Sequence, residues 1–395
     1  MKKVIVVGFT YMDLKISSNN RNNYLPQFLH NNGYDVELIV SNFNHHRKEH
    51  VKEVEKRDYK CTILPEIGYK KNVSIKRIFS IRSYVKSLKK YLKTKEPVDY
   101  VISFVPDHGV AQAAAKYAKR VGAKFIIDVR DVWPETFIIA LKSKLLYNLV
   151  CWPLVLQANK TYRIANEVVA VSETYLKRAL SVNKKVKGGH VIYLGTSFSE
   201  FDFFAKKAED IHKDENEVWV MYTGTIGNSY DLDSLFRAYR LILDEGYTNV
   251  KLHVLGNGPL EEKYHKLDKE LNTKIIFYGR RPYSEMAAYL KKADIVINPL
   301  VKGAGQSIIN KHADYAASGV PVVSTQTTQE YIDLLSKYNA GLTAKNEDVN
   351  DLKDKIIYLI DNPQIRLEMG KNHRRMGEEL FDRDKIYDEF LYILK

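Results

Sequence analysis

The chain has 395 residues, of which 45% are hydrophobic and 28% are charged. This composition is typical of a folded cytosolic protein, and the length exceeds one ordinary core, so two α/β domains are expected. The two cysteines, Cys61 and Cys151, fit neither a disulfide framework nor a metal knuckle, which indicates a reducing compartment and a cytoplasmic location.

No apolar stretch reaches the ~20 residues that a membrane-spanning helix requires. The N-terminal run Val4–Val7 is too short for a secretion signal and predicts a buried first strand. The nearest approach to a span, Leu145–Leu156, is interrupted by Asn148 and Pro153. It predicts a buried or interfacial helix.

The net charge of +13 is unevenly distributed along the chain. Residues 1–200 hold 34 Lys and Arg against 17 Asp and Glu, whereas residues 201–395 hold 27 against 31. A basic first half indicates an anionic partner, for which nucleic acid, anionic lipid and a phosphorylated acceptor all qualify. The chain shows no basic-aromatic motif for nucleic-acid recognition, so no nucleic-acid partner is expected.

In the first half, short β-branched runs alternate with helical patterns. The elements expected there, in chain order, are the strand Val4–Val7, a helix over Asn23–Asn32, the strand Asp35–Val40, a basic helix over Ile75–Lys93, the strand Tyr100–Phe104, a helix over Ala111–Val121, and the strands Lys124–Val129, Glu167–Ser172 and Val191–Leu194. Such alternation predicts a parallel sheet covered by helices on both faces.

The polar segment 195–216 shows no sheet pattern and is the predicted linker. A second alternation follows it, with strands at Val218–Tyr222, Lys251–Leu255, Lys274–Tyr278, Ile295–Ile297 and Val320–Ser324. Two successive βα series predict two doubly wound α/β domains facing across a cleft. We expect domains at 1–200 and 201–375, with residues 376–395 forming a helix that packs back on the first domain.

The first strand of the second domain ends in Tyr222-Thr-Gly224-Thr225-Ile-Gly227, and a helix is expected from Asp231. The glycines permit tight turns, and the amino end of a helix attracts phosphate, so this loop is a candidate diphosphate site. An ordinary strand–turn–helix connection is equally compatible with the spacing. Asp231 is expected to cap the helix rather than to bind a metal.

Two further loops end strands at the same expected sheet edge. Gly256 and Asn257 follow one strand, and Gly279, Arg280 and Arg281 follow the next. Because ligands of parallel sheets lie at the carboxyl ends of the strands, the two arginines are candidate phosphate ligands. A solvated turn is the alternative for either arginine.

The loop Lys302–Gly305 leads into a helix expected to begin at Gln306 and Ser307. Lys311 and Asp314 lie three residues apart on it and therefore share a face. A lysine and a carboxylate beside a glycine-rich loop are suited to a charged, hydroxylated ligand, although a surface Lys–Asp pair would have the same spacing.

Together these motifs resemble the donor domain of family 4 of the retaining GT-B glycosyltransferases of bacterial capsule and exopolysaccharide biosynthesis. The resemblance covers Met221–Gly341, and it rests on the order of these motifs more than on any single one. The acidic positions of the family's E-x7-E signature fall on Gln306 and Asp314 here. The resemblance implies that the backbone amides of Ser307 to Ile309, Ile308 included, bind the donor diphosphate.

The chain departs from this family at two loop positions. The family's arginine and lysine after the first strand of this domain are replaced by Thr225 and Tyr230. Lys311, Arg280 or Arg281 would then supply the positive charge.

The first half resembles the same family more loosely. Arg21, in the loop after the first strand, together with His45 and Lys48, would bind the acceptor. Asp131 would orient an acceptor hydroxyl and His108 would contact the sugar, although both also suit structural caps. Three neighbouring histidines, His45, His46 and His50, lack carboxylate partners, so a basic loop is expected rather than a metal site.

The resemblance implies a hexosyltransferase that moves a sugar from a nucleotide-sugar donor, a UDP-sugar foremost, with retention. The acceptor would be a saccharide or a lipid-diphosphate-linked sugar, and no metal or other cofactor is expected. Lys311 would stabilise the leaving diphosphate. The basic stretch 77–95 would contact an anionic membrane at its inner face, or would be a core helix with a solvated lysine face. A non-catalytic partner subunit and a nucleotide-sugar epimerase are the competing functions.

Overall fold

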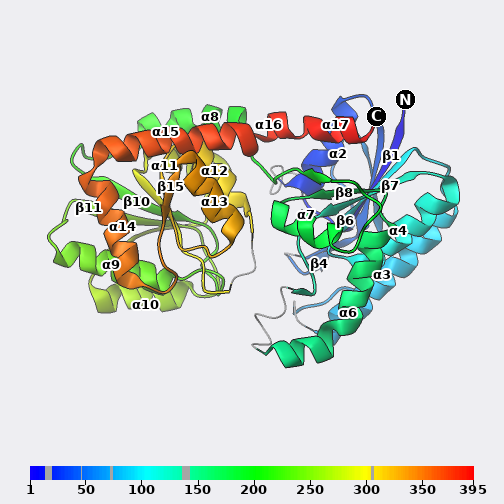
Figure 1. Ribbon diagram of the computed structural model, residues 1–395, viewed down its shortest axis with the longest axis horizontal. Helices are drawn as coiled ribbons and strands as arrows, with labels where there is room; N and C mark the ends of the chain where they lie inside the picture. The colour runs from blue at the N-terminus through cyan, green and yellow to red at the C-terminus, as the bar shows by residue number, and fades with distance from the viewer. Residues whose placement is uncertain (14–19, 46, 72–73, 136–142, 304–306) are drawn as a thin grey trace. The chain divides into compact units, whose positions relative to one another are not determined.

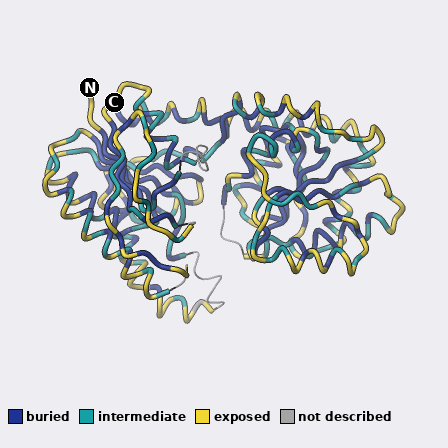
Figure 2. Tube along the Cα trace, turned by 180° about the vertical axis from the view of Figure 1, so that it is seen from behind, coloured by how far each residue is buried: buried dark blue, intermediate teal, exposed yellow. Residues whose placement is uncertain are grey.

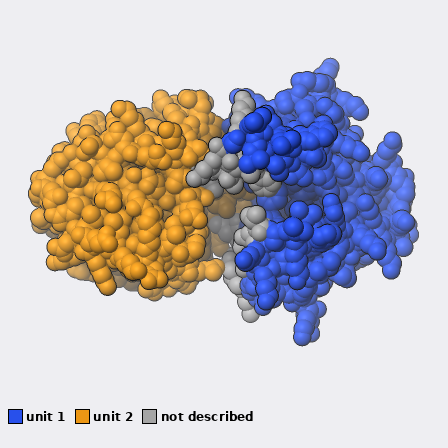
Figure 3. All heavy atoms as spheres, turned by 90° about the horizontal axis from the view of Figure 1, so that it is seen from below, with its two compact units in different colours: residues 1–192, 387–395 blue, residues 193–386 orange. Residues whose placement is uncertain are grey.

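The computed structural model describes all residues except 14–19, 46, 72–73, 136–142 and 304–306. The chain divides into two compact units, Met1–Ile192 with Tyr387–Lys395 (unit 1) and Tyr193–Ile386 (unit 2). Figure 3 colours the two units separately. The sequence placed these boundaries near residues 200 and 375.

Unit 1 is built on a seven-stranded parallel sheet in the order β5-β2-β1-β6-β7-β8-β9. Its strands are β1 (Lys3–Thr10), β2 (Asp35–Ser41), β5 (Lys60–Leu64), β6 (Tyr100–Val105), β7 (Lys124–Val129), β8 (Glu167–Ala170) and β9 (His190–Val191). β3 (Phe43–Asn44) and β4 (Glu49–His50) pair separately as a short antiparallel ladder. The central strands are buried on both faces, as Figure 2 shows in dark blue, because helices cover the sheet on each side.

Helices connect these strands in the expected alternation (Figure 1). They are α2 (Arg21–Asn31), α3 (Ile75–Lys93), α4 (His108–Val121), α6 (Lys144–Ile164) and α7 (Glu173–Leu180), with α17 (Asp388–Ile393) returning from the C-terminal end of the chain. Ser74 caps α3 by accepting from the amide of Arg77, and Ser143 caps α6 by accepting from the amide of Leu146. The prediction of a helix over Ile75–Lys93 is confirmed. Among the described residues, no helix is both long and apolar enough to cross a membrane.

A buried arginine attaches the C-terminal segment to unit 1. Arg21 is 3% exposed, and its guanidinium pairs with Asp128 at 2.9 Å and donates to the carbonyl of Ile192 at 2.5 Å. The same group lies 5.2 Å from the ring centroid of Tyr387 and 4.9 Å from that of Phe390. The prediction that Arg21 lies in a loop is wrong, because it is the first residue of α2. These contacts make it an anchor for α17.

Unit 2 is built on a six-stranded parallel sheet in the order β12-β11-β10-β13-β14-β15. Its strands are β10 (Val218–Thr223), β11 (Val250–Leu255), β12 (Ile276–Gly279), β13 (Ile295–Asn298), β14 (Val322–Ser324) and β15 (Gly341–Thr343). Its helices are α8 (Phe198–Ala205), α9 (Leu232–Asp244), α10 (Glu261–Leu271), α11 (Tyr283–Lys292), α12 (Asn310–Ser318), α13 (Gln329–Tyr338), α14 (Val349–Asp361), α15 (Pro363–Leu380) and α16 (Arg383–Ile386). Its core gathers apolar side chains of β10, β11, β13, α9 and α14.

The segment 195–216 is not a linker, and that prediction is wrong. It forms α8 and a 3₁₀ helix over Lys206–Asp210, both inside unit 2. Ser197 caps α8 by accepting from the amide of Glu200, and Phe198 and Phe201 are buried on one face. The charged residues that made the segment resemble a linker lie largely on the opposite, solvated face.

The first prediction concerns Arg21. Arg21→Ala should lower the free energy of unfolding by about 3 kcal/mol, because it leaves Asp128 buried with one cation fewer. Arg47→Ala is the matched control, since that arginine is 44% exposed and pairs at the surface with Asp13 and Glu49. Its loss should stay below about 1 kcal/mol in urea denaturation. Equal losses in the two variants would contradict the anchoring role.

Candidate functional site

Three loops of unit 2 converge at the carboxyl ends of the neighbouring strands β12, β11 and β10. The amide of Gly224 donates to the carbonyl of Leu255 at 3.0 Å, and the amide of Gly256 donates to the carbonyl of Gly279 at 2.9 Å. Ile226 and Asn257 are joined in the same way at 3.0 Å. The loops after β10, β11 and β12 are therefore tied together by their backbones.

Glycine is required where the first two of these loops cross. Gly224 has φ +141° and Gly256 has φ +146°, and a Cβ on Gly256 would lie 1.8 Å from the carbonyl oxygen of Gly224. No side chain fits in that gap. The close crossing leaves a small-residue platform at the sheet edge, which is the kind of surface that a diphosphate needs for close backbone approach.

Lys311 lies against this platform. It belongs to α12, is 9% exposed, and would have its Nζ 2.9 Å from a Cβ placed on Gly224. Nζ lies 4.2 Å from the ring centroid of Tyr222 and 3.8 Å from that of Tyr230. Among the described residues Nζ has no hydrogen-bond partner. Burial holds the pKa of Lys311 well below its usual range, while the two ring faces favour its charged form.

Asp314 points to other partners. Its carboxylate accepts from the hydroxyl of Tyr283 at 3.0 Å, and that hydroxyl also contacts Thr196 at 2.7 Å. Burial raises the pKa of Asp314 to about 6. The possibility of a surface Lys–Asp pair is therefore wrong: Lys311 is buried, Asp314 is half-buried and bonded to Tyr283, and no ion pair joins them among the described residues.

The described segment before α12, residues 307–309, is not helical. The prediction of a helix beginning at Gln306 and Ser307 is wrong, because α12 begins at Asn310 with Ile309 as its N-cap. The carbonyl of Ser307 accepts from the side-chain amide of Gln326, so it does not start a helical ladder. Gln306 lies outside the described residues.

Buried polar side chains hold the segment 307–309. The hydroxyl of Ser307 donates to Glu330 at 2.7 Å, and Ile308 is 6% exposed. Beneath it the side-chain amide of Asn298 contacts His312 at 3.1 Å, and the ring of His312 stacks on Tyr331 with centroids 3.6 Å apart. Sequence reasoning missed this network, because nothing in the sequence pattern marks its members as neighbours.

Most of the remaining candidates of unit 2 are more exposed. Thr225, Asn257 and Arg280 are exposed, and Arg281 is held locally by the carbonyl of Tyr278 at 3.0 Å and by Glu285 at 3.5 Å. The predicted N-cap is confirmed, since Asp231 accepts from the amide of Ser234 at 3.0 Å. Gly227 lies in the bend between β10 and α9.

In unit 1, cations and aromatic rings gather beyond the carboxyl ends of the strands. Nδ1 of His45 lies 2.5 Å from the hydroxyl of Tyr69 and 3.3 Å from Nζ of Lys48. Lys48 lies 4.9 Å and Arg77 5.5 Å from the ring centroid of Tyr69. Burial and the nearby Arg77 lower the pKa of Lys48. His46 lies outside the described residues.

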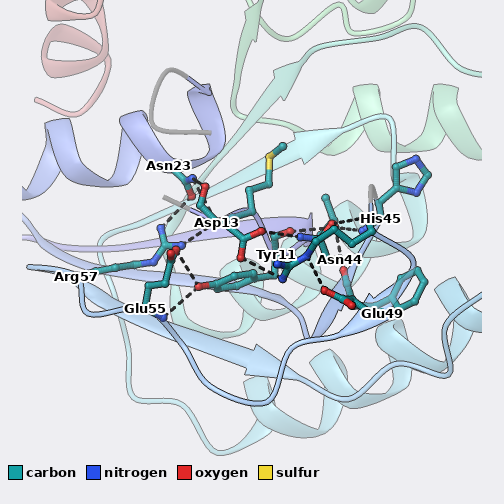
Figure 4. A network of polar contacts seen from close by, with 12 residues as sticks. Tyr11, Asp13, Asn23, Asn44, His45, Glu49, Glu55 and Arg57 are labelled. Carbon is teal, nitrogen blue, oxygen red and sulfur yellow. Dashed lines mark hydrogen bonds and ion pairs between the residues drawn. The ribbon is translucent and has the colours of Figure 1, made fainter. Parts of the chain in front are cut away.

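Figure 4 shows His45 at one end of a polar network. The amide of His45 donates to Thr10, and the neighbouring Asn44 donates to Asp13 at 3.1 Å. The amide of Glu55 donates to Tyr11 farther along the network, at 3.1 Å. The loop that carries His45 and Lys48 is thus fixed to the end of β1.

The Asp131 carboxylate is engaged locally. It accepts from the amide of Val132 and from the indole of Trp133, both at 2.8 Å, and burial raises its pKa. His108 contacts the carbonyl of Trp133 at 2.9 Å, and burial lowers its pKa. The ring of Trp133 lies 4.9 Å from the guanidinium of Arg77, so these residues border the Tyr69 cluster. The neighbouring Asp107, which sequence reasoning did not select, has its pKa raised to about 7 by burial.

The family match falls on the unit that holds the platform and Lys311. Residues 203–376 match the family of group 1 glycosyl transferases. The expected resemblance to glycosyltransferases is confirmed, whereas retention and a capsule role stay predictions.

A curated relative matches the chain over a longer stretch. The chain is 26% identical over 238 residues to the capsular polysaccharide biosynthesis glycosyltransferase CapM of Staphylococcus aureus, which covers 57% of this chain and 60% of that protein. The chain spans about three fifths of the length of the curated relatives it matches first.

Solved structures resemble the whole chain. Sucrose-phosphate synthase of Thermosynechococcus elongatus has a TM-score of 0.74 at 15% identity, covering 100% of this chain and 98% of that one. HepE of Anabaena, in complex with UDP, has a TM-score of 0.69 at 12% identity, covering 100% and 99%. At such identities the likeness shows the fold, so the predicted two-domain α/β class of the GT-B type is confirmed.

The second prediction tests the crossing of the loops. Gly256→Ala should destabilise the protein by about 2 kcal/mol more than Gly246→Ala, measured by thermal or urea unfolding. Both glycines have positive φ, but a Cβ on Gly246 meets nothing within 4 Å. The control thus carries the backbone strain without the overlap. Similar losses would mean that the loops part easily.

Proposed function

We propose that this protein is a glycosyltransferase that takes a sugar from a nucleotide-sugar donor bound to unit 2 and transfers it to an acceptor bound to unit 1. The observation that carries the proposal is the placement of Lys311 against Gly224, at the crossing of the loops after β10 and β11. A lysine beside a glycine platform at the carboxyl edge of a parallel sheet is suited to a diphosphate.

Lys311 of α12 would supply the positive charge that stabilises the bound donor diphosphate. The family's two loop cations are replaced here by Thr225 and Tyr230, and the ring of Tyr230 packs on Nζ of Lys311. We therefore infer that Tyr230 holds Lys311 where it can replace a loop cation. Because a bound diphosphate would stabilise the charged form of Lys311, burial of this amine is compatible with its function.

The proposed chemistry needs stabilisation of a leaving diphosphate, which Lys311 and backbone amides supply. We propose transfer with retention, without a protein nucleophile and without a metal. Asp314 would act through its hydrogen bond to Tyr283, as a residue that positions α12 and therefore Lys311. The exposed Arg280 could also contact the phosphates. UDP is the first donor nucleotide to test, because HepE, which shares the fold, binds UDP.

The acceptor would carry a negative charge. Lys48, Arg77 and His45 surround Tyr69, which favours a phosphate group flanked by a sugar that stacks on the rings. A lipid-diphosphate-linked sugar has this chemistry, and similarity to CapM supports a role in surface polysaccharide synthesis. His108 and Asp131, which border this cluster, are the proposed sugar contacts.

A panel of UDP-, GDP- and dTDP-sugars, screened by thermal shift and then by nucleotide release, tests the proposal. Stabilisation by one donor together with its turnover is expected. A non-catalytic partner subunit would show neither turnover nor hydrolysis. An epimerase would convert the sugar without releasing nucleotide, and the relatives named above are transferases.

The third prediction concerns the donor site. Lys311→Met should weaken UDP binding by about 2 kcal/mol, or roughly thirtyfold, because it removes a charge-assisted contact to phosphate while keeping the apolar stem. Lys269→Met, on the exposed end of α10, makes the same change of net charge and should leave binding unchanged. Calorimetric titration with UDP measures both. Equal affinities in the two variants would remove Lys311 from the donor site.

The fourth prediction concerns the acceptor site. With UDP saturating unit 2, pyrophosphate should bind the Lys48 cluster, and Lys48→Met should weaken that binding roughly tenfold. Lys116→Met, on the exposed face of α4, is the control and should change nothing. If pyrophosphate binds the Lys48 variant as tightly as the control, the anionic acceptor site lies elsewhere.

A further inference from the structure

The outward face of α6 is apolar. Leu145 is 82% exposed, Leu149 74%, Trp152 57% and Leu156 51%, and these positions follow one another along the side of the helix opposite buried Cys151. A surface helix of a soluble protein normally turns polar residues outward. Three turns of large exposed apolar side chains mark a surface that another phase or molecule covers.

The side of α6 that faces the rest of unit 1 is buried, as is usual for a helix that packs on a protein core. Cys151, Ala158, Thr161 and Tyr162 are each at most 2% exposed and recur at helical spacing. Through these residues α6 packs on the rest of unit 1, mostly along its C-terminal half, without using the outward leucines and Trp152. The exposed apolar side chains do not belong to the core of this unit.

A second helix of unit 1 also exposes apolar side chains. Ile75, Ile78 and Phe79, in the first turns of α3, are 73%, 51% and 54% exposed. α3 and α6 both pack beside Gly109 of α4, where a Cβ would lie 3.5 Å from Val85 and 3.6 Å from Gln157. Figure 1 labels both helices on unit 1, and we call their exposed residues within 75–93 and 145–163 the α3/α6 face.

The charge of the α3/α6 face is of one sign. α3 contains seven Lys and Arg and α6 contains three, and neither helix contains Asp or Glu. Lys76 lies among the apolar residues of α3, and the other exposed cations follow the apolar turns of both helices: Arg82, Lys86, Lys89, Lys90 and Lys93 on α3, and Lys160 and Arg163 on α6. Apolar side chains flanked by cations match the chemistry of an anionic bilayer surface, where acyl chains lie beneath phosphate headgroups.

Charge also argues against a second copy of the chain as the occupant. A symmetric pairing through the α3/α6 face would bring two purely cationic helix surfaces together, with no carboxylate on either helix to compensate. An anionic lipid surface meets the same cations with complementary charge. Trp152 adds a ring of the type that prefers the boundary between headgroups and acyl chains.

We propose that the α3/α6 face docks on an anionic lipid bilayer, with Leu145, Leu149, Trp152 and Leu156 entering the headgroup boundary and the lysines of α3 contacting lipid phosphates. This docking needs no sugar donor and stands independently of the transfer reaction. It would keep unit 1 at the surface where a lipid-linked acceptor is found.

Co-sedimentation of the full chain with vesicles tests the proposal. The protein should bind vesicles of phosphatidylcholine mixed with phosphatidylglycerol, and should bind pure phosphatidylcholine much more weakly, with salt lowering the affinity. The double variant Leu149→Gln/Trp152→Gln should lose about tenfold or more in affinity for the anionic vesicles. It lacks two large apolar side chains whose transfer from water into the bilayer favours binding.

A matched control separates insertion from general stickiness. Phe203→Gln/Leu367→Gln removes two apolar side chains of unit 2 that are 65% and 58% exposed, and it should bind vesicles like the wild type. Lys89→Gln/Lys90→Gln should weaken binding to anionic vesicles only. Equal binding by the α6 variant and the control would overturn the proposal. So would a wild-type dimer that the α6 variant converts to monomer, since a second copy would then cover the face.

Discussion

The close crossing of two backbones in unit 2 organises the candidate donor site. Gly224 and Gly256 approach so closely that a single methyl group would overlap the facing carbonyl. Because that contact excludes side chains, the edge above β10 and β11 stays open to a ligand's phosphates, and Lys311 can reach it from α12. The rings of Tyr222 and Tyr230 then fill the space around its amine.

Placing an amine in such surroundings costs free energy, which the rest of the unit must offset. The neighbouring segment is held by polar side chains that satisfy one another, with Ser307 bonded to Glu330 and Asn298 to His312. A satisfied buried network is rigid. The platform and the lysine are therefore pre-arranged, so little conformational entropy would be lost when a diphosphate binds.

Two arginines of unit 1, Arg21 and Arg77, have different roles. Arg21 is buried with Asp128 beneath Tyr387 and Phe390, so it fastens the end of the chain to the sheet. Arg77 instead lies between the rings of Tyr69 and Trp133, where it adds positive charge to the cluster of His45 and Lys48. Burial against a carboxylate makes one arginine structural, and stacking at the carboxyl edge of the sheet makes the other a candidate ligand.

The sequence by itself determined the architecture and the order of the motifs. Periodicity located α3 to the residue, and the runs of β-branched residues located the central strands, because buried parallel strands need nearly continuous apolar side chains. The glycines and Lys311 could be selected as candidates from local pattern, because backbone conformation and charge are properties of single residues.

Only the tertiary structure decided how these residues are used. The expected linker 195–216 contains α8, and Arg21 lies in the core instead of a loop. The helix α12 begins at Asn310, and Asp314 bonds to Tyr283 instead of Lys311. Each outcome depends on partners distant in the chain, such as Asp128 or Gln326, which local pattern cannot anticipate. The outward leucines of α6 show the same limit, since an apolar run specifies that a helix avoids water but not what it contacts instead.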